Sequence, residues 1–123
     1  MTKPQKQTFT FLSRVAPYGS NRPQLCLDAA LAAAVFEQQV NYVFMEDGVY
    51  QLLKNQDGEA IQAKPIGNAL ETLDLYGIEN VYVCNAALES RGLSLEDLVI
   101  EPKLASSEEL KTMLSASDNV INL

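Results

Sequence analysis

The chain has no histidine and no tryptophan, and its 123 residues include only two cysteines. Without histidine, a Cys–His or Ser–His catalytic pair within the chain is excluded, and so is a zinc site of the usual His and Cys count. We therefore expect no bound metal. The two cysteines, Cys26 and Cys84, are expected to be free thiols, because an intracellular domain of this size needs no disulfide.

Long apolar runs and a basic surface are also missing. No stretch approaches the ~20 residues of a transmembrane helix, and the polar residues 1–8 are not followed by the apolar stretch and cleavage site of a signal peptide. We expect a cytoplasmic protein that does not contact the membrane. Sixteen acidic against nine basic residues give a net charge of −7. Direct binding to RNA or DNA is thereby disfavoured, since Lys and Arg supply most of the non-specific affinity for phosphate.

What the chain does contain is typical of one globular domain, which we place at residues 1–123. Its 47% apolar and 20% charged residues are ordinary values, and the spacing of the apolar residues alternates between that of strands and that of helices. We expect strands at residues 7–14, 40–45, 81–84, 99–100 or the stretch toward 104, and 119–123. Helices are expected at 25–39, 66–76 and 86–91 and after a capping box at Ser106 and Glu109, with a short helix or turn at 49–53.

This alternation predicts the α/β class: a five-stranded, mostly parallel sheet with helices on both faces, joined by right-handed crossovers. In such a sheet a binding crevice lies beyond the carboxyl ends of the strands, where the strand order reverses. If the order is the flavodoxin-like one, the first and third strands are neighbours there. Cys84, the last residue of the third strand, would then lie beside the loop 16–22.

Cys84 is the strongest candidate for chemistry. The helix that starts directly after it offers free N–H groups and a positive dipole end, which favour a thiolate or persulfide anion. The structural alternative is that Cys84 only fills a strand end, because free cysteine is among the most buried residue types. Cys26 lies inside the expected helix 25–39, where a structural role is favoured.

Three charged residues fall near the same edge. Arg14 and Arg91 could pair with a persulfide or with acidic groups of a partner, although each is more often part of a surface salt bridge. Asp47 follows the second strand and is expected to cap the next helix rather than to bind a partner. The loop 17–22 has a single glycine and so lacks the phosphate cradle of flavin or nucleotide sites. We expect no cofactor.

Several segments resemble a known family. Residues 83–93, VCNAALESRGL, resemble the V-C-x-A-A/S-L-x-x-R-G-L/I signature that follows the third strand of DsrE-like proteins. Residues 16–19 (APYG), 47–53 (DGVYQLL) and 75–78 (LYGI) are similar to stretches of the TusC/DsrF branch. The matches occur in order from the first strand to the C-terminal VINL, so the chain is identified as a member of the DsrE/DsrF-like sulfur-relay family.

The resemblance implies a subunit of a heterohexamer with TusB/DsrH-like and TusD/DsrE-like chains, which passes persulfide sulfur to a DsrC/TusE-like acceptor. In the TusC-like version the sulfur ends in 2-thiouridine at the tRNA wobble position, and in the DsrF-like version the complex serves sulfur oxidation. Cys84 matches by motif the cysteine that carries persulfide in the TusD/DsrE subunit, which makes it the candidate persulfide carrier. A scaffold role, with a sister subunit carrying the sulfur, stays open.

Two further expectations concern function. An unrelated α/β module that binds a small ligand is a third possibility, weakened by the absent phosphate loop and by the motif match. Association with other subunits is expected, since residues 40–44 and 49–53 offer apolar surface beyond what a small core absorbs.

Overall fold

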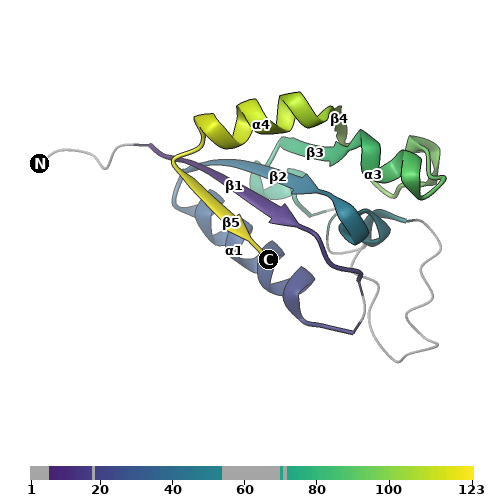
Figure 1. Ribbon diagram of the computed structural model, residues 1–123. Coiled ribbons are helices and arrows are strands. Elements are labelled where there is room, and N and C mark those ends of the chain that lie inside the picture. The colour runs from purple at the N-terminus through teal and green to yellow at the C-terminus, as the bar shows by residue number, and fades with distance from the viewer. Residues whose placement is uncertain (1–5, 18, 54–69, 71) are drawn as a thin grey trace, which may run out of the picture.

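The computed structural model describes residues 6–17, 19–53, 70 and 72–123 (Figure 1). The helices and strands are, in chain order, β1 (Thr8–Ser13), α1 (Arg22–Val35), β2 (Gln39–Phe44), β3 (Asn80–Cys84), α3 (Asn85–Ser90), β4 (Lys103–Ala105), α4 (Ser107–Ala116) and β5 (Asn119–Asn122). Short 3₁₀ helices are η1 (Glu46–Leu52), η3 (Asp74–Tyr76) and η4 (Leu95–Asp97). No helix among these residues is long and apolar enough to cross a membrane.

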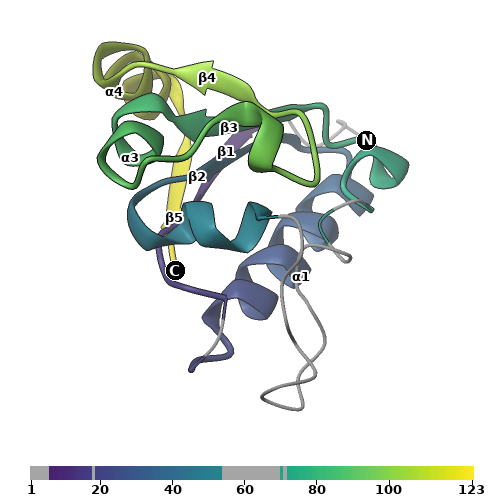
Figure 2. The same cartoon turned by 90° about the vertical axis from the view of Figure 1, so that its right-hand side faces the viewer.

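The strands form one sheet in the order β4-β3-β2-β1-β5, and every pairing is parallel. Helix α1 covers one face of the sheet and α4 the other, as Figures 1 and 2 show. The predicted five-stranded parallel α/β sheet is thereby confirmed. The flavodoxin-like order is not present, because β2 lies between β1 and β3.

The predicted elements are present, with shifted boundaries that have local causes. Helix α1 begins at Arg22, before the predicted start, because Pro23 stands in its first turn, where proline's missing N–H costs nothing. It ends at Val35, two residues before Glu37, whose φ of 61° is left-handed. The fourth strand is the stretch near 104 and not Val99 and Ile100.

The expected helix 66–76 lies partly outside the described residues. Its described end is η3, which stops at Gly77, and Gly77 has a φ of 81° and is the predicted left-handed C-cap. The predicted Ser106–Glu109 capping box is present at the start of α4.

The core is built around β2, the middle strand of the sheet. Tyr42, Val43 and Phe44 are all fully buried, since helices cover both faces here. Val49 and Leu52 of η1 are also fully buried. The expectation that residues 40–44 and 49–53 supply the apolar surface for association is therefore wrong, because these residues fill the core.

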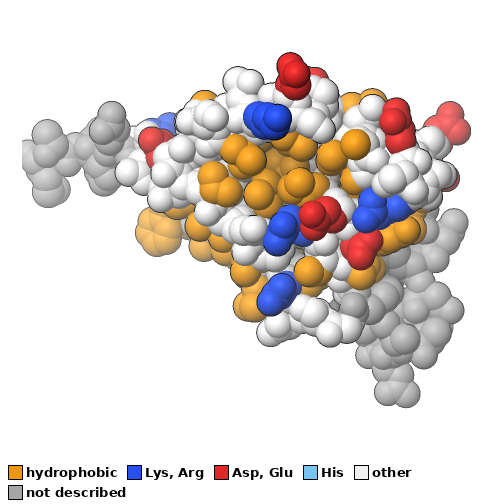
Figure 3. All heavy atoms as spheres, viewed as in Figure 1, with side chains coloured by type: hydrophobic (Ala, Val, Ile, Leu, Met, Phe, Trp, Pro, Cys, Tyr) orange, Lys and Arg blue, Asp and Glu red, His pale blue; other side chains and the backbone are white. Residues whose placement is uncertain are grey.

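Exposed apolar side chains lie elsewhere. Val35 and Phe36 at the end of α1 are 65% and 75% exposed, and Leu75 and Tyr76 of η3 are 83% and 52% exposed. Phe36 and Tyr76 line one groove of about 1040 Å³. Figure 3 shows a further gathering of apolar side chains over the middle of the sheet below α4, bordered by charged side chains.

Candidate functional site

Cys84 is the last residue of β3 and the N-cap residue of α3, as its place in the sequence predicts. Its register partner is Ala105 of β4, and the alternation along β3 puts it on the same face as Tyr82. Tyr82 and Ala105 line a cleft with α4 side chains, so Cys84 lies on the α4 face of the sheet. The residue is 8% exposed, which leaves part of it in contact with solvent.

The surroundings of Cys84 differ from the expectation. The neighbours of β3 are β2 and β4, so β1, which leads into the loop 16–22, does not adjoin the strand that carries Cys84. The segment that meets α3 is instead η1, the 3₁₀ helix directly after β2. The crevice predicted between the first and third strands is thus replaced by a junction between α3 and η1.

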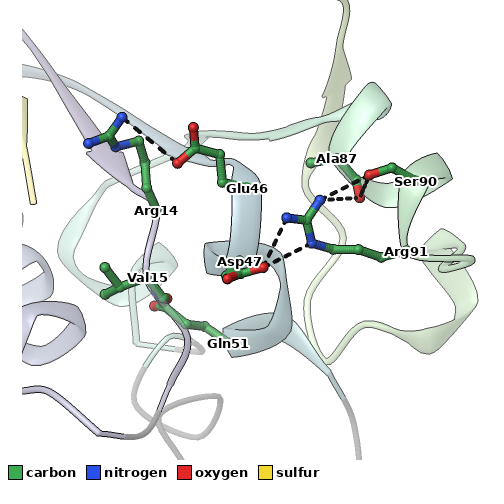
Figure 4. A network of polar contacts seen from close by, with 8 residues as sticks. All are labelled: Arg14, Val15, Glu46, Asp47, Gln51, Ala87, Ser90 and Arg91. Atoms are coloured by element: carbon green, nitrogen blue, oxygen red, sulfur yellow. Dashed lines mark hydrogen bonds and ion pairs between the residues drawn. The ribbon is translucent and has the colours of Figure 1, made fainter.

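Arg91 joins these two elements (Figure 4). Its Nη2 and Nε atoms donate to one carboxylate oxygen of Asp47 in η1, at 2.9 and 3.3 Å. Nη1 donates to the carbonyl oxygen of Ala87 at 3.2 Å and to Ser90 Oγ at 3.0 Å. The guanidinium carbon lies 5.8 Å from the centre of the Tyr50 ring, a cation–π distance. Arg91 is thus a structural link and not a free cation.

Asp47 does not cap η1, contrary to the prediction. The N-cap residue is Met45, and no side chain caps the helix through a hydrogen bond. Asp47 stands in the first turn of η1, and its carboxylate accepts from Arg91. Arg14 pairs with Glu46 more loosely, at 3.8 Å, and both of these side chains are well exposed. Both arginines therefore form salt bridges, which was the structural alternative for each.

Gln51 of η1 is a buried polar residue that its place in the sequence did not single out. The side-chain amide of Gln51 donates to Ser13 Oγ at 2.7 Å and to the carbonyl oxygen of Val15 at 2.9 Å. Gln51 and Ser13 are both 0% exposed. A glutamine inside the otherwise apolar run VYQLL was the available signal, because a buried amide needs hydrogen-bond partners.

Cys26 is fully buried in α1, as its helical position predicts. Burial raises the pKa of its thiol, and hydrogen bonding with Tyr42 and Ser13 partly opposes that rise. Tyr42 neighbours Val81 in the sheet, one residue from Tyr82, so it faces α1 and not α4. The two cysteines, both free, thus lie on opposite faces of the sheet, which leaves no geometry for a disulfide between them.

The chemical capacity of the carboxyl edge of β3 therefore rests on one largely buried cysteine at a strand–helix junction. In the part of the chain that the structure describes, no group of three or more His, Cys, Asp or Glu side chains could hold a metal ion.

Comparison with known proteins points in one direction. The chain is 39% identical over 113 residues to a TusC homologue of Vibrio parahaemolyticus, covering 92% of this chain and 96% of that protein. It is 41% identical over 91 residues to the intracellular sulfur oxidation protein DsrF of Allochromatium vinosum, covering 74% of this chain and 67% of DsrF.

Solved structures agree with the sequence relatives. The crystal structure of the ychN protein from E. coli superimposes with a TM-score of 0.81 at 26% identity, over 95% of this chain and 99% of ychN. The DsrE/DsrF-like family profile matches residues 7–123, from the residue before β1 to the last residue. The chain belongs to the DsrE/DsrF-like family.

Proposed function

We propose that this chain is a TusC-like subunit of a sulfur-relay complex that passes persulfide sulfur between carrier proteins for 2-thiouridine formation at the tRNA wobble position. The observation that carries the proposal is the match to TusC homologues over nearly the full length of both chains. The resemblance noted in the sequence supplies the partners: TusB/DsrH-like and TusD/DsrE-like subunits in a heterohexamer, and a DsrC/TusE-like acceptor. The proposed compartment is the cytoplasm.

Cys84 is the proposed persulfide carrier of this chain. The Cys84 thiolate would attack the outer sulfur of a donor persulfide, R–S–SH, so that a new S–S bond forms and the old one breaks. The products are the Cys84 persulfide and the donor thiolate, and no external oxidant or reductant is needed. Two features support this assignment: the strand-end position and the start of α3 at the next residue.

A scaffold role is the alternative within the same complex. At 8% exposure, Cys84 offers little surface to a donor protein. In that case the chain would organise the complex and a sister subunit would carry the sulfur.

A second pathway also has a specific observation in its favour. The 41% identity to DsrF over 91 residues is as high as the identity to the TusC homologues, although it covers less of both chains. Under this alternative the same relay would serve sulfur oxidation. The net charge of −7 fits either version, since in both a partner protein, and not this chain, would meet any nucleic acid.

The test is sulfur loading of the wild-type chain and of Cys84→Ser, each co-expressed with its two sister subunits. Incubation with a persulfidated donor followed by mass spectrometry should show one added sulfur atom on Cys84, and the variant should assemble but stay unloaded. An assembled complex that thiolates tRNA at an unchanged rate with Cys84→Ser would assign the relay to a sister subunit. tRNA that stays unthiolated while sulfur oxidation proceeds would favour the DsrF-like alternative.

A further inference from the structure

We propose that Arg91 is a positioning residue for Cys84, because its side chain fixes the short helix α3 against η1 and so sets how far the Cys84 thiol is exposed. The inference deepens the proposed function, since it rests on Cys84 being the thiol that the relay uses.

Helix α3 needs such a support. It has six residues, well short of the length at which a helix is stable in water by itself. Only Ala87 and Leu88 of its residues are buried, so the apolar contacts that hold it are few. Cys84 is its N-cap residue, and any movement of the first turn moves the thiol.

The Arg91 side chain contacts both α3 and η1. It folds back along α3 to the carbonyl oxygen of Ala87, the third residue of the helix, and it reaches out to Asp47 and to the ring of Tyr50 (Figure 4). Charge-assisted bonds from several guanidinium nitrogens fix orientation more strictly than a single contact does. The Arg91 side chain is 22% exposed against 41% for Arg14, although the Asp47 side chain, at 61%, is exposed to water.

The nearby pair Arg14–Glu46 provides a matched control. It links β1's end to the same η1, carries the same charges, and has an N–O distance of 3.8 Å with both side chains well exposed. Arg14→Gln therefore removes one positive charge from the same edge without breaking the link between η1 and α3. Comparison of Arg14→Gln with Arg91→Gln thus separates the effect of losing a positive charge from the effect of losing the link between η1 and α3.

The experiment is alkylation of the full-length chain by iodoacetamide across a range of pH, with each cysteine followed separately by mass spectrometry. At high pH, where every thiol is deprotonated, the alkylation rate reaches a plateau. The height of this plateau reports how accessible Cys84 is, and it does not depend on how strongly nearby charges favour the thiolate. Cys26, which is fully buried, reports global unfolding in the same sample.

Arg91→Gln and Asp47→Asn should each raise the Cys84 plateau roughly fivefold, about the upper end of what the loss of an ion pair with an exposed carboxylate costs. Cys26 should stay protected, and the double variant should exceed the single ones only slightly, because both changes break the same link. Arg91→Lys, which keeps the charge and one donor, should fall between wild type and Arg91→Gln.

Three results would overturn the proposal: an unchanged Cys84 plateau in both variants, an equal rise in Arg14→Gln, or labelling of Cys26 in step with Cys84. If Arg91→Gln does not fold, Asp47→Asn decides the matter alone. Wild-type Cys84 that alkylates as expected but accepts no sulfur would contradict the proposed carrier role of Cys84 and leave the positioning role standing.

Discussion

Gly48 shows how closely η1 sits on the sheet. A Cβ atom built on Gly48 would lie 2.0 Å from the carbonyl oxygen of Ser13 and 2.7 Å from its carbonyl carbon. Both obstacles are backbone atoms at the end of β1, so no side chain could rotate out of the way. The glycine is therefore required by close approach, and its φ is not in the left-handed region.

Gly48→Ala should lower the free energy of unfolding by roughly 2 to 3 kcal/mol, because η1 must lift away from β1. Urea denaturation followed by circular dichroism measures the change. Lifting η1 would also strain the Gln51–Ser13 hydrogen bond and the core contacts of Val49. A loss below about 0.5 kcal/mol, the range of ordinary surface substitutions, would mean that the close approach is relieved cheaply.

Cys26 makes stability depend on alkaline pH. Burial raises the pKa of its thiol above the ordinary value of 9.0, so on raising the pH the unfolded chain loses this proton before the folded one does. The contribution to stability is complete below pH 9.0 and declines as the pH rises toward the folded-state pKa. The slope for one such group is at most about 1.4 kcal/mol per pH unit.

Cys26→Ser should therefore flatten the decline in unfolding free energy between about pH 9 and pH 10, since serine does not titrate there. Urea denaturation of the two proteins at several pH values checks this. Tyr42, whose pKa burial also raises, should still cause a decline at higher pH in both proteins. Identical slopes in wild type and Cys26→Ser would contradict the prediction.

At the scale of elements, a capping box defines the start of α4. Ser106 Oγ accepts from the N–H of Glu109 at 3.1 Å, and the Glu109 carboxylate accepts from the N–H of Ser106 at 3.3 Å. Ser106→Ala should cost about 1 kcal/mol through loss of the cap. Ser107→Ala, one residue further on, removes an equal hydroxyl that is not the cap and should change stability much less. Thermal melts of the two variants compare them directly, and equal melting temperatures would show that the capping box contributes nothing.

The sequence predicted elements better than their arrangement. Capping at Ser106, the helix end at Gly77 and the strand before Cys84 depend on neighbours in the chain, so local patterns indicate them. Which strands pair depends on where each crossover lands, and a parallel strand has the same local pattern beside either neighbour. The placement of β2 between β1 and β3 was for that reason not predictable from spacing.

The same limit applies to the candidate site. Cys84 was found by its strand-end position and motif, and the structure puts it at the predicted strand–helix junction. The link between Arg91 and Asp47 spans 44 residues of sequence, and only the contact of η1 with α3 brings them together. From charge alone, Arg91 could equally have been a free cation and Asp47 a helix cap.

At the scale of the whole molecule, one group of exposed apolar side chains, Val35, Phe36, Leu75 and Tyr76, lies at the end of the sheet opposite to Cys84. Phe36 and Tyr76 line a groove near the amino end of β2, whereas Cys84 ends β3 at the carboxyl edge. Subunit contact at this groove would leave the thiol free to meet a donor or an acceptor. The proposed complex needs such a separation, because a relay subunit must bind its sister chains and its sulfur partners at the same time.

The double variant Phe36→Ser/Tyr76→Ser should therefore weaken assembly with the sister subunits without slowing alkylation of Cys84. The two side chains are 75% and 52% exposed, so replacing them removes apolar surface that only a partner would bury, and the fold should be retained. Light scattering of the co-expressed subunits measures assembly, and Leu95→Ser, at 41% exposure on η4, is the matched control. Truncation of central interface residues commonly costs 2 kcal/mol or more, so dissociation should occur at roughly thirtyfold higher concentration. Complexes of normal size and affinity in the double variant, or equal weakening by Leu95→Ser, would place the subunit contact on another face.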